Sequence, residues 1–300
     1  MSPRVVPFDG APLPGTPVVP LGEGTRCKPV NNLDMSSVID VALREMCPRE
    51  LRLRIRRGEW DRPTAGLATG FAQANLVAVP RDVAYDFLVF CHRNPKPCPL
   101  IDVTDPGSPH PTRAAPGADL RTDLPRYRVY RRGRLEAEET EITRYWRDDF
   151  VAFLLGCSFT FEAAMVRAGL PVRHIQDGRN VPMYTTSIQC RPAGALRGPM
   201  VVSMRPLPPE AVPRAILVTA RYPGAHGAPV HVGDSAAIGV RDLARPQFGD
   251  PPRIEARDVP VFWGCGVTPQ VVATDVELMI THAPGHMFLT DLFDEDLGIG

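Results

Sequence analysis

A glycine–cysteine–glycine turn is the first candidate for chemistry in this sequence. Gly264, Cys265 and Gly266 follow a strand-like apolar run, and a helix is predicted to begin with Thr268 as its cap and a proline at its first position. The glycines would let the backbone come close to a ligand, and the amides of the helix start would favour a carboxylate or an oxyanion. Cys265 would then serve as an acid, a base or a nucleophile at the rim. The alternative interpretation is a tight turn around a buried, inert thiol.

Four of the seven histidines lie beside glycine or proline turns at the ends of predicted strands. In α/β sheets, ligands bind in a crevice at the ends of strands. His226 and His231 precede Asp234, which would either orient an imidazole for proton transfer or cap a short helix. His282 and His286 are four residues apart, but the proline and glycine between them argue against a helix and therefore against a metal site. We predict proton transfer by these histidines and no metal. The alternative is that loop imidazoles only bind backbone carbonyls.

Two arginines and one asparagine are candidates for holding a carboxylate substrate. Arg179 and Asn180 lie in a polar turn before a predicted strand, and Arg205 lies at the end of another. A guanidinium group matches a carboxylate with two parallel hydrogen bonds. The alternative for each arginine is a surface position or an internal ion pair.

The composition favours a small-molecule partner. The 34 basic and 34 acidic residues cancel, so no field of one sign would attract nucleic acid or an anionic membrane. The motifs of phosphate-binding loops and serine esterases are absent from the sequence. The longest strongly apolar stretch, residues 150–161, is shorter than the ~20 residues that cross a bilayer, and we expect it in the core. We predict a small carboxylate ligand, no cofactor, no nucleic acid and no membrane.

The cysteines and the first residues of the chain bear on its location. Seven cysteines are odd in number and lack zinc-site spacing, which fits reduced thiols in a cytosol. Prolines interrupt any apolar helix near the start, which argues against a secretory signal. We therefore expect a cytoplasmic protein, and a homo-oligomer stays open.

Alternating helix and strand patterns must position these residues. Two short helices are expected before a strand at 75–80, and a helix then precedes another strand at 99–104. A loop rich in proline and glycine follows, and after it a hairpin is predicted to turn near Gly133. A helix ending before Gly169 and further alternating segments indicate an α/β sheet.

The composition and the order of predicted elements along the chain suggest that it has three parts. Residues 1–33 are rich in proline and glycine and are predicted to form an irregular extension. The main α/β domain is expected to comprise residues 34–118 and 200–300. A smaller α+β domain is expected at 119–199.

Several long segments together resemble the D-glutamate cyclase family, whose bacterial members are called hydro-lyases. They include RRGEWDRPTAGLATGFAQANLVAVP, WRDDFVAFLLGCSFTFEAAM and ITHAPGHMFLTD, in the family's order, and the resemblance covers roughly residues 54–296. It implies a larger three-layer α/β/α domain with a smaller two-layer α+β domain inserted in it. It also implies loss of water from D-glutamate, whose amine attacks its own γ-carboxyl group to give 5-oxo-D-proline.

That reaction assigns hypothetical roles to the candidate residues. The helix start after Gly266 would bind an oxyanion or a carboxylate, and His231 with one of the two later histidines would transfer protons. Arg179 or Arg205 would hold the α-carboxylate. Two alternatives stay open: a hydro-lyase acting on a different small acid, and a binding protein that holds a small carboxylate without turnover.

Overall fold

Buried apolar runs become the central strands of two antiparallel sheets. The computed structural model describes residues 38–299, so the predicted extension at 1–33 lies outside the described residues. The first sheet has seven strands in the order β2-β5-β1-β10-β3-β4, and β11 also pairs with β1. Its strands are β1 (Phe71–Pro80), β2 (Leu100–Val103), β3 (Tyr127–Arg131), β4 (Arg134–Glu139), β5 (Phe150–Gly156), β10 (Leu278–His282) and β11 (Phe288–Phe293).

The second sheet has four strands in the order β6-β7-β9-β8. Strand β7 runs antiparallel to both of its neighbours, so it forms the centre of this sheet together with β9. The strands are β6 (Met183–Gln189), β7 (Pro199–Leu207), β8 (His231–Val232) and β9 (Val259–Gly264).

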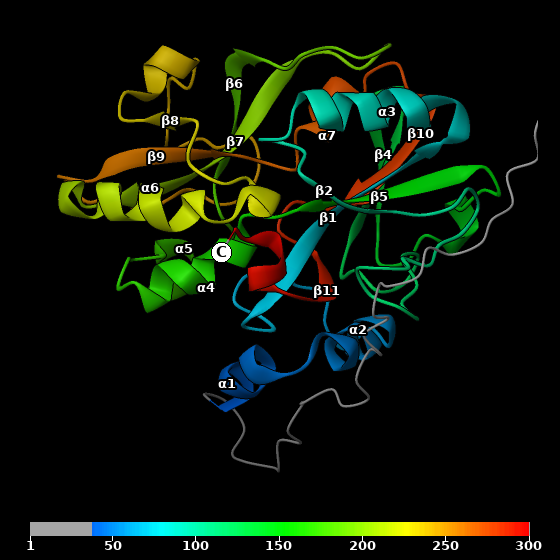
Figure 1. The fold of residues 1–300 in the computed structure, drawn as a ribbon, viewed down its shortest axis with the longest axis horizontal. Helices are drawn as coiled ribbons and strands as arrows, with labels where there is room; N and C mark the ends of the chain where they lie inside the picture. The colour runs from blue at the N-terminus through cyan, green and yellow to red at the C-terminus, as the bar shows by residue number, and fades with distance from the viewer. Residues whose placement is uncertain (1–37, 300) are drawn as a thin grey trace, which may run out of the picture. The chain divides into compact units, whose positions relative to one another are not determined.

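Helices cover both sheets (Figure 1). In Figure 1, α3 lies over one face of the first sheet, α2 lies near β11, and α6 runs beside β9 with α4 and α5 below it. The α-helices are α1 (Val38–Glu45), α2 (Pro48–Arg56), α3 (Arg81–Arg93), α4 (Phe159–Arg167), α5 (Arg173–Gln176), α6 (Val212–Ala220) and α7 (Pro269–Val272). Short 3₁₀ turns are η1 (Thr143–Tyr145), η2 (Pro209–Ala211), η3 (Pro223–Ala225), η4 (Ser235–Ile238) and η5 (Asp294–Leu297).

Strand β1 is buried on both faces, and this explains its continuous apolar sequence. Val77 packs in one core cluster with Phe87 of α3, whereas Leu76 packs in another with Phe161 of α4. Successive side chains of a strand point to opposite faces, so both must be apolar here. The stretch 150–161 is likewise core, because every residue of β5 is buried.

The predicted hairpin is confirmed, with β3 and β4 joined by a tight turn. Arg132 and Gly133 both have positive φ, of 47° and 71°, as a two-residue hairpin turn of this hand requires. A Cβ atom at Gly133 would lie 2.7 Å from the backbone of Thr274, so glycine is needed there for space as well. Strand β3 also pairs antiparallel with β10, with Tyr127 opposite His282, so the segment before β3 lies next to the loop that follows β10.

The mixed α/β class is confirmed, with two sheets and several helices. The three-layer arrangement with an inserted two-layer domain remains a prediction. Strands β3, β4 and β5 come from the predicted smaller domain at 119–199, yet they pair in one sheet with β1 and β10, so the pairing does not follow that boundary. The change in sequence composition after residue 104 marks a long loop.

Among the described residues, no helix has both the length and the apolar character needed to span a membrane.

Candidate functional site

A cavity of about 310 Å³ lies where β1, α4 and the turn after β11 meet. We call it the carboxyl cavity and define it by its polar lining residues, which are Arg44, Thr69, Gln73, Glu162, Arg167 and Asp294. Apolar side chains make up much of the remaining wall, including Phe71 and Phe159. Its volume lies at the lower end of the range for ligand pockets, about 300–1,000 Å³, which suits a small molecule.

Glu162 is a buried carboxylate on α4 that is held in its ionised form. The side chain is 2% exposed, and its Oε1 accepts hydrogen bonds from Nε and Nη2 of Arg205. His174 Nε2 lies 3.0 Å from the same oxygen but is poorly aligned for a hydrogen bond, so we regard this contact as mainly electrostatic. Burial favours a higher pKa for Glu162, but the charges of His174 and Arg205 outweigh it and hold the pKa below its ordinary value. Its Oε2 is buried and has no protein partner.

Arg205 does not serve as the predicted substrate clamp. It is 1% exposed, and besides Glu162 its guanidinium donates to the hydroxyls of Ser158 and Ser203. The guanidinium also lies 5.2 Å from the ring centre of Phe161. These contacts use the group internally, which is the ion-pair alternative left open by the sequence. Arg205 therefore fixes the position and the charge of Glu162.

Asp294 is the second buried carboxyl group of the cavity, and its environment favours the opposite protonation state. It is 1% exposed, and neither of its carboxyl oxygens has a hydrogen-bond partner. Burial raises the pKa of Asp294 from 3.8 to about 7, and the nearby charge of Glu295 adds to this rise. A proton on this carboxyl group can therefore exchange near neutral pH, while Glu162 stays ionised.

Two arginines complete the charged lining of the cavity. Arg44 comes from the last turn of α1, and Arg167 comes from the last turn of α4. Arg167 is half-exposed, and its nearest acidic partner, Glu295, lies 3.8 Å away. The cavity thus combines two guanidinium groups, one ionised carboxylate and one carboxyl group that can be neutral, which is a set suited to a ligand carrying carboxylates and an ammonium group.

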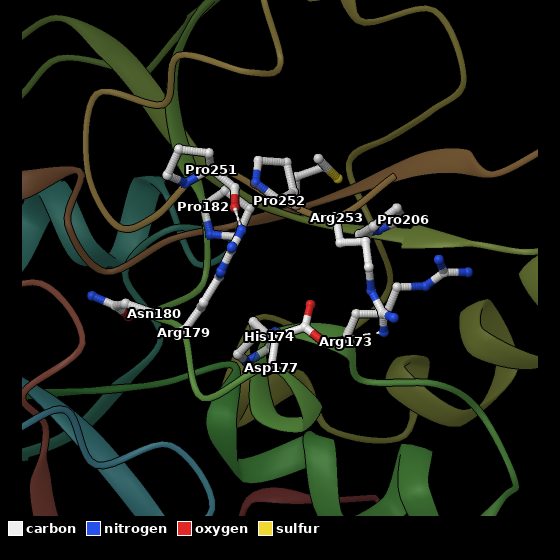
Figure 2. A pocket seen from close by; sticks show the side chains of 11 residues that line it. Arg173, His174, Asp177, Arg179, Asn180, Pro182, Pro206, Pro251, Pro252 and Arg253 are labelled. Carbon is white, nitrogen blue, oxygen red and sulfur yellow. Dashed lines mark hydrogen bonds and ion pairs between the residues drawn. The ribbon is translucent and has the colours of Figure 1, made fainter. Parts of the chain in front are cut away.

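Arg179 and Asn180 lie beside a much smaller cavity, of about 10 Å³ (Figure 2). This volume is at the lower limit for one water molecule, so no amino acid fits inside. Arg179 Nη1 donates to the carbonyl oxygen of Pro251 at 3.0 Å, which makes it a contact between two loops. Figure 2 shows the Asn180 side chain directed away from this cavity.

Asn180 and His286, predicted from separate segments of the sequence, lie beside the same cleft. They line an open cleft of about 410 Å³, which we call the polar cleft and define by Arg126, Arg128, Asn180, Asp250 and His286. Nδ2 of Asn180 donates to the carbonyl oxygen of Pro284, two residues before His286. The polar cleft and the carboxyl cavity share no lining residue.

The other predicted histidines lie in separate places. His231 is on β8 of the second sheet, where its Nε2 contacts the backbone oxygen of Asp234 at 2.7 Å. The Asp234 carboxylate accepts from Ala236 N, which confirms its capping role. His282 is fully buried on β10 of the first sheet, and burial lowers its pKa to about 3. The sheets are antiparallel throughout their described pairings, so strand ends that follow one another in sequence do not gather at one edge.

His226 has the environment of a structural imidazole. It is 1% exposed, and its Nδ1 lies 2.7 Å from the carbonyl oxygen of Lys96. Burial lowers its pKa to about 4, so it stays neutral at physiological pH. This is the backbone-bonded alternative that the sequence left open.

The turn at Gly264–Gly266 packs tightly inside the protein. A Cβ atom on Gly264 would lie 2.6 Å from the Lys96 carbonyl oxygen, and one on Gly266 would lie 2.2 Å from the Asn75 side chain. The glycines therefore allow close internal packing. The thiol of Cys265 is 8% exposed, and burial raises its pKa to about 11. This environment fits the inert thiol of the alternative interpretation and not a nucleophile at a rim.

The helix after this turn is a single turn long, and several backbone amides near its start have internal partners. A helix does begin at Pro269, but α7 is a single turn of four residues. Thr268 is fully buried, and its hydroxyl donates to the carbonyl oxygen of Cys265 and accepts from Val201 N. The backbone amides of Cys265, Thr268 and Gln270 are also used internally, so they cannot bind an oxyanion.

Within residues 38–299, no group of three His, Cys, Asp or Glu residues could hold a metal ion.

Comparisons with known proteins agree with the family resemblance. The sequence model of a family described as D-glutamate cyclase matches residues 151–291. A protein of Stutzerimonas stutzeri (strain A1501), named "Putative hydro-lyase", is 65% identical over 260 residues, which are 86% of this chain and 98% of the relative. A relative of the same description in Bacillus subtilis (strain 168) is 57% identical over 256 residues, 85% of this chain and 100% of the relative.

The similarity extends to Rubrobacter xylanophilus (strain DSM 9941), whose relative is 61% identical over 249 residues, 82% of this chain and 96% of the relative. Sequence identity of this degree, over most of this chain and of each relative, groups the chain with the proteins that carry the hydro-lyase name. The chain belongs to the D-glutamate cyclase family.

Proposed function

We propose that the carboxyl cavity is the active site of a hydro-lyase that cyclises D-glutamate to 5-oxo-D-proline and water. The observation that carries this proposal is the pair of buried carboxyl groups in one cavity, each with a free oxygen and with pKa values moved in opposite directions. Carboxyl groups whose environments separate their pKa values are a common arrangement for acid–base catalysis. The family name supports the choice of D-glutamate.

The charges of the cavity complement those of glutamate. Glutamate carries two carboxylates and one ammonium group, and the cavity offers two guanidinium groups and one ionised carboxylate. The free Oε2 of Glu162 would accept a hydrogen bond from the ammonium group. Arg44 and Arg167 would hold the carboxylates at the mouth. Placing the amine and the γ-carboxyl group in one small cavity would favour the curled conformation that cyclisation requires.

Asp294 would carry the proton transfers. Because its pKa of about 7 is close to ordinary working pH, it exchanges protons in both directions. The ammonium group loses a proton, and its nitrogen attacks the γ-carboxyl carbon to form the new N–C bond. The ionised form of Asp294 takes this proton and returns it to one oxygen of the tetrahedral intermediate. The nitrogen then passes its second proton to the same oxygen by the same route, and the C–O bond breaks to release water. An arginine at the mouth would stabilise the negative oxygen that remains.

The ion pair between Arg205 and Glu162 would keep Glu162 ionised and correctly oriented in the cavity. The guanidinium of Arg205 donates two hydrogen bonds to Oε1 of Glu162, and these hold the carboxylate so that Oε2 faces a fixed direction. Removing Arg205 would leave a buried carboxylate without its partner, and Glu162 would then take up a proton more easily. A protonated Glu162 would attract the substrate ammonium group less strongly.

The proposal is tested by a panel of small acids. Purified full-length protein is incubated separately with D-glutamate, L-glutamate, D-aspartate and a 2-hydroxy acid of the same length, and the loss of one water is followed by mass spectrometry. We expect conversion of D-glutamate, and a strong reduction of that conversion in both Glu162→Gln and Asp294→Asn. Conversion of another acid alone would contradict the substrate, and binding without conversion of any acid would favour a non-catalytic carboxylate-binding protein.

A further inference from the structure

We propose that the polar cleft is a second ligand site, and that it binds an α-amino acid as a zwitterion. The cleft has a volume of about 410 Å³ and takes its walls from both sheets: the segment before β3, strands β3 and β4, the loop after β10, and two loops next to β6 and β9. No residue of the proposed active site lines it. The inference therefore does not depend on the chemistry of the carboxyl cavity.

One wall of the cleft offers a free hydrogen-bond donor on a positive group. Nε of Arg126 is buried and has no partner, and its Nη2 makes only a long contact of 3.3 Å with the exposed carboxylate of Asp61. The neighbouring Arg128 is already engaged by Glu138 at 2.6 Å. A carboxylate placed against Arg126 would satisfy the orphaned donor with a charge-assisted hydrogen bond.

The opposite wall offers a free acceptor beside a negative charge. Nδ2 of Asn180 donates to the Pro284 carbonyl oxygen at 3.0 Å, which leaves Oδ1 as the acceptor, and Oδ1 is buried with no partner. The backbone amide of Asn180 donates to the carboxylate of Asp250 at 2.7 Å, so the negative charge lies next to this acceptor. An ammonium group would match both the acceptor and the charge.

His286 adds a second acceptor between these walls. Its Nδ1 lies 3.1 Å from the Pro284 carbonyl oxygen, so Nδ1 carries the proton and Nε2 is the accepting atom. Burial lowers the pKa of His286, which favours this neutral form. The groups around it are the guanidinium of Arg126 and the carboxylates of Glu138 and Asp61.

The balance of charge in the cleft selects the ligand class. An anion alone would meet the guanidinium of Arg126 but would also meet the carboxylates of Asp250 and Glu138. A cation alone would be attracted by the two carboxylates but repelled by the guanidinium. A zwitterion places each of its charges against the opposite charge, and separate donor and acceptor walls fix its orientation. The bonds of Asn180 to Pro284 and Asp250 are made without a ligand, so this acceptor wall is pre-organised.

Nuclear magnetic resonance of ¹³C-labelled histidine in the full-length protein tests the site directly. The His286 ring signal is assigned with a His286→Gln variant, and the protein is titrated with glycine, which has no γ-carboxyl group and cannot undergo the proposed cyclisation. Acetate and methylammonium, each carrying one of the two charges, are titrated in parallel. We expect saturable movement of the His286 signal with glycine, and binding of each one-charge probe weaker by about tenfold or more.

Two variants and one control locate the binding to the proposed walls. Arg126→Gln and Asn180→Ala should each weaken glycine binding by about 10- to 100-fold, the range for one lost charge-assisted hydrogen bond. Arg131→Gln alters an exposed arginine of β3, the strand that follows Arg126, where it pairs with Glu136, and should leave binding unchanged. A His286 signal that glycine does not move, unchanged binding in both variants, or acetate binding as tight as glycine would overturn the inference. Failure of D-glutamate turnover would bear only on the carboxyl cavity.

Discussion

Replacing Asp294 with asparagine should remove a pH dependence from the stability of this protein. The folded protein keeps Asp294 protonated up to about pH 7, whereas the unfolded chain ionises it near 3.8. Between these two pH values the folded state binds more protons than the unfolded state. The stability of the wild type therefore falls as pH rises from 3.8 to about 7 and levels off above that.

The structure sets the size of this effect. Moving the pKa of one carboxyl group from 3.8 to about 7 corresponds to at most about 4 kcal/mol of unfolding free energy. The stabilisation is fully present below the unfolded pKa and is lost as pH rises through the folded one. Asparagine cannot ionise, so the variant should lack this contribution at every pH.

The assay is urea unfolding of both proteins at a series of pH values between 4 and 8. The difference in unfolding free energy between wild type and Asp294→Asn should change across this range in favour of the variant, by up to about 4 kcal/mol. Asp275→Asn, at an exposed position, serves as the matched control and should show a constant difference. If the Asp294 and Asp275 variants behave alike, Asp294 does not carry a raised pKa and cannot act as the proposed acid.

Three further changes follow from the geometry. Glu162→Gln removes the charge that neutralises the buried Arg205, so the unfolding free energy should fall by about 3–5 kcal/mol in urea titrations, and an unchanged value would contradict the buried ion pair. Gly249→Ala would place a Cβ atom 2.0 Å from the Val181 carbonyl oxygen at a φ of +76°, so its Tm should drop more than that of Gly58→Ala, which has a similar φ but open space. Cys265→Ser should keep the rate of D-glutamate turnover, because burial raises the pKa of the thiol to about 11, and loss of turnover in a folded variant would restore its catalytic role.

Elements set by local sequence were predictable. Gly169, just past the end of α4, adopts the positive φ of +73° that favours glycine after a helix. The turn at Gly133 and the strand within β1 follow from equally local signals. Sheet membership was not predictable in this way, because the pairing of β5 with β1 joins segments separated by a helix, three other strands and a long loop.

The two buried carboxyl groups of the carboxyl cavity could not be predicted from the sequence, for a physical reason. Neither Glu162 nor Asp294 carries a motif, and an acidic residue is usually exposed. Their burial arises only when α4 and η5 pack beside β1. The one sequence signal was an acidic residue within the apolar run that starts α4, where Glu162 directly follows Phe161. The histidines at strand ends drew attention through a rule for parallel sheets, and the described pairings are antiparallel.

The most direct test of the proposed activity is a proton NMR time course of the purified protein with D-glutamate, followed in parallel with 5-oxo-D-proline to cover both directions. We expect stereoselective appearance of 5-oxoproline signals with D-glutamate and none with L-glutamate. The rate should fall by at least about a hundredfold in Asp294→Asn, the usual minimum for loss of a general acid–base group. An Asp294→Asn protein that converts D-glutamate at the wild-type rate would contradict the assignment of the active site to the carboxyl cavity.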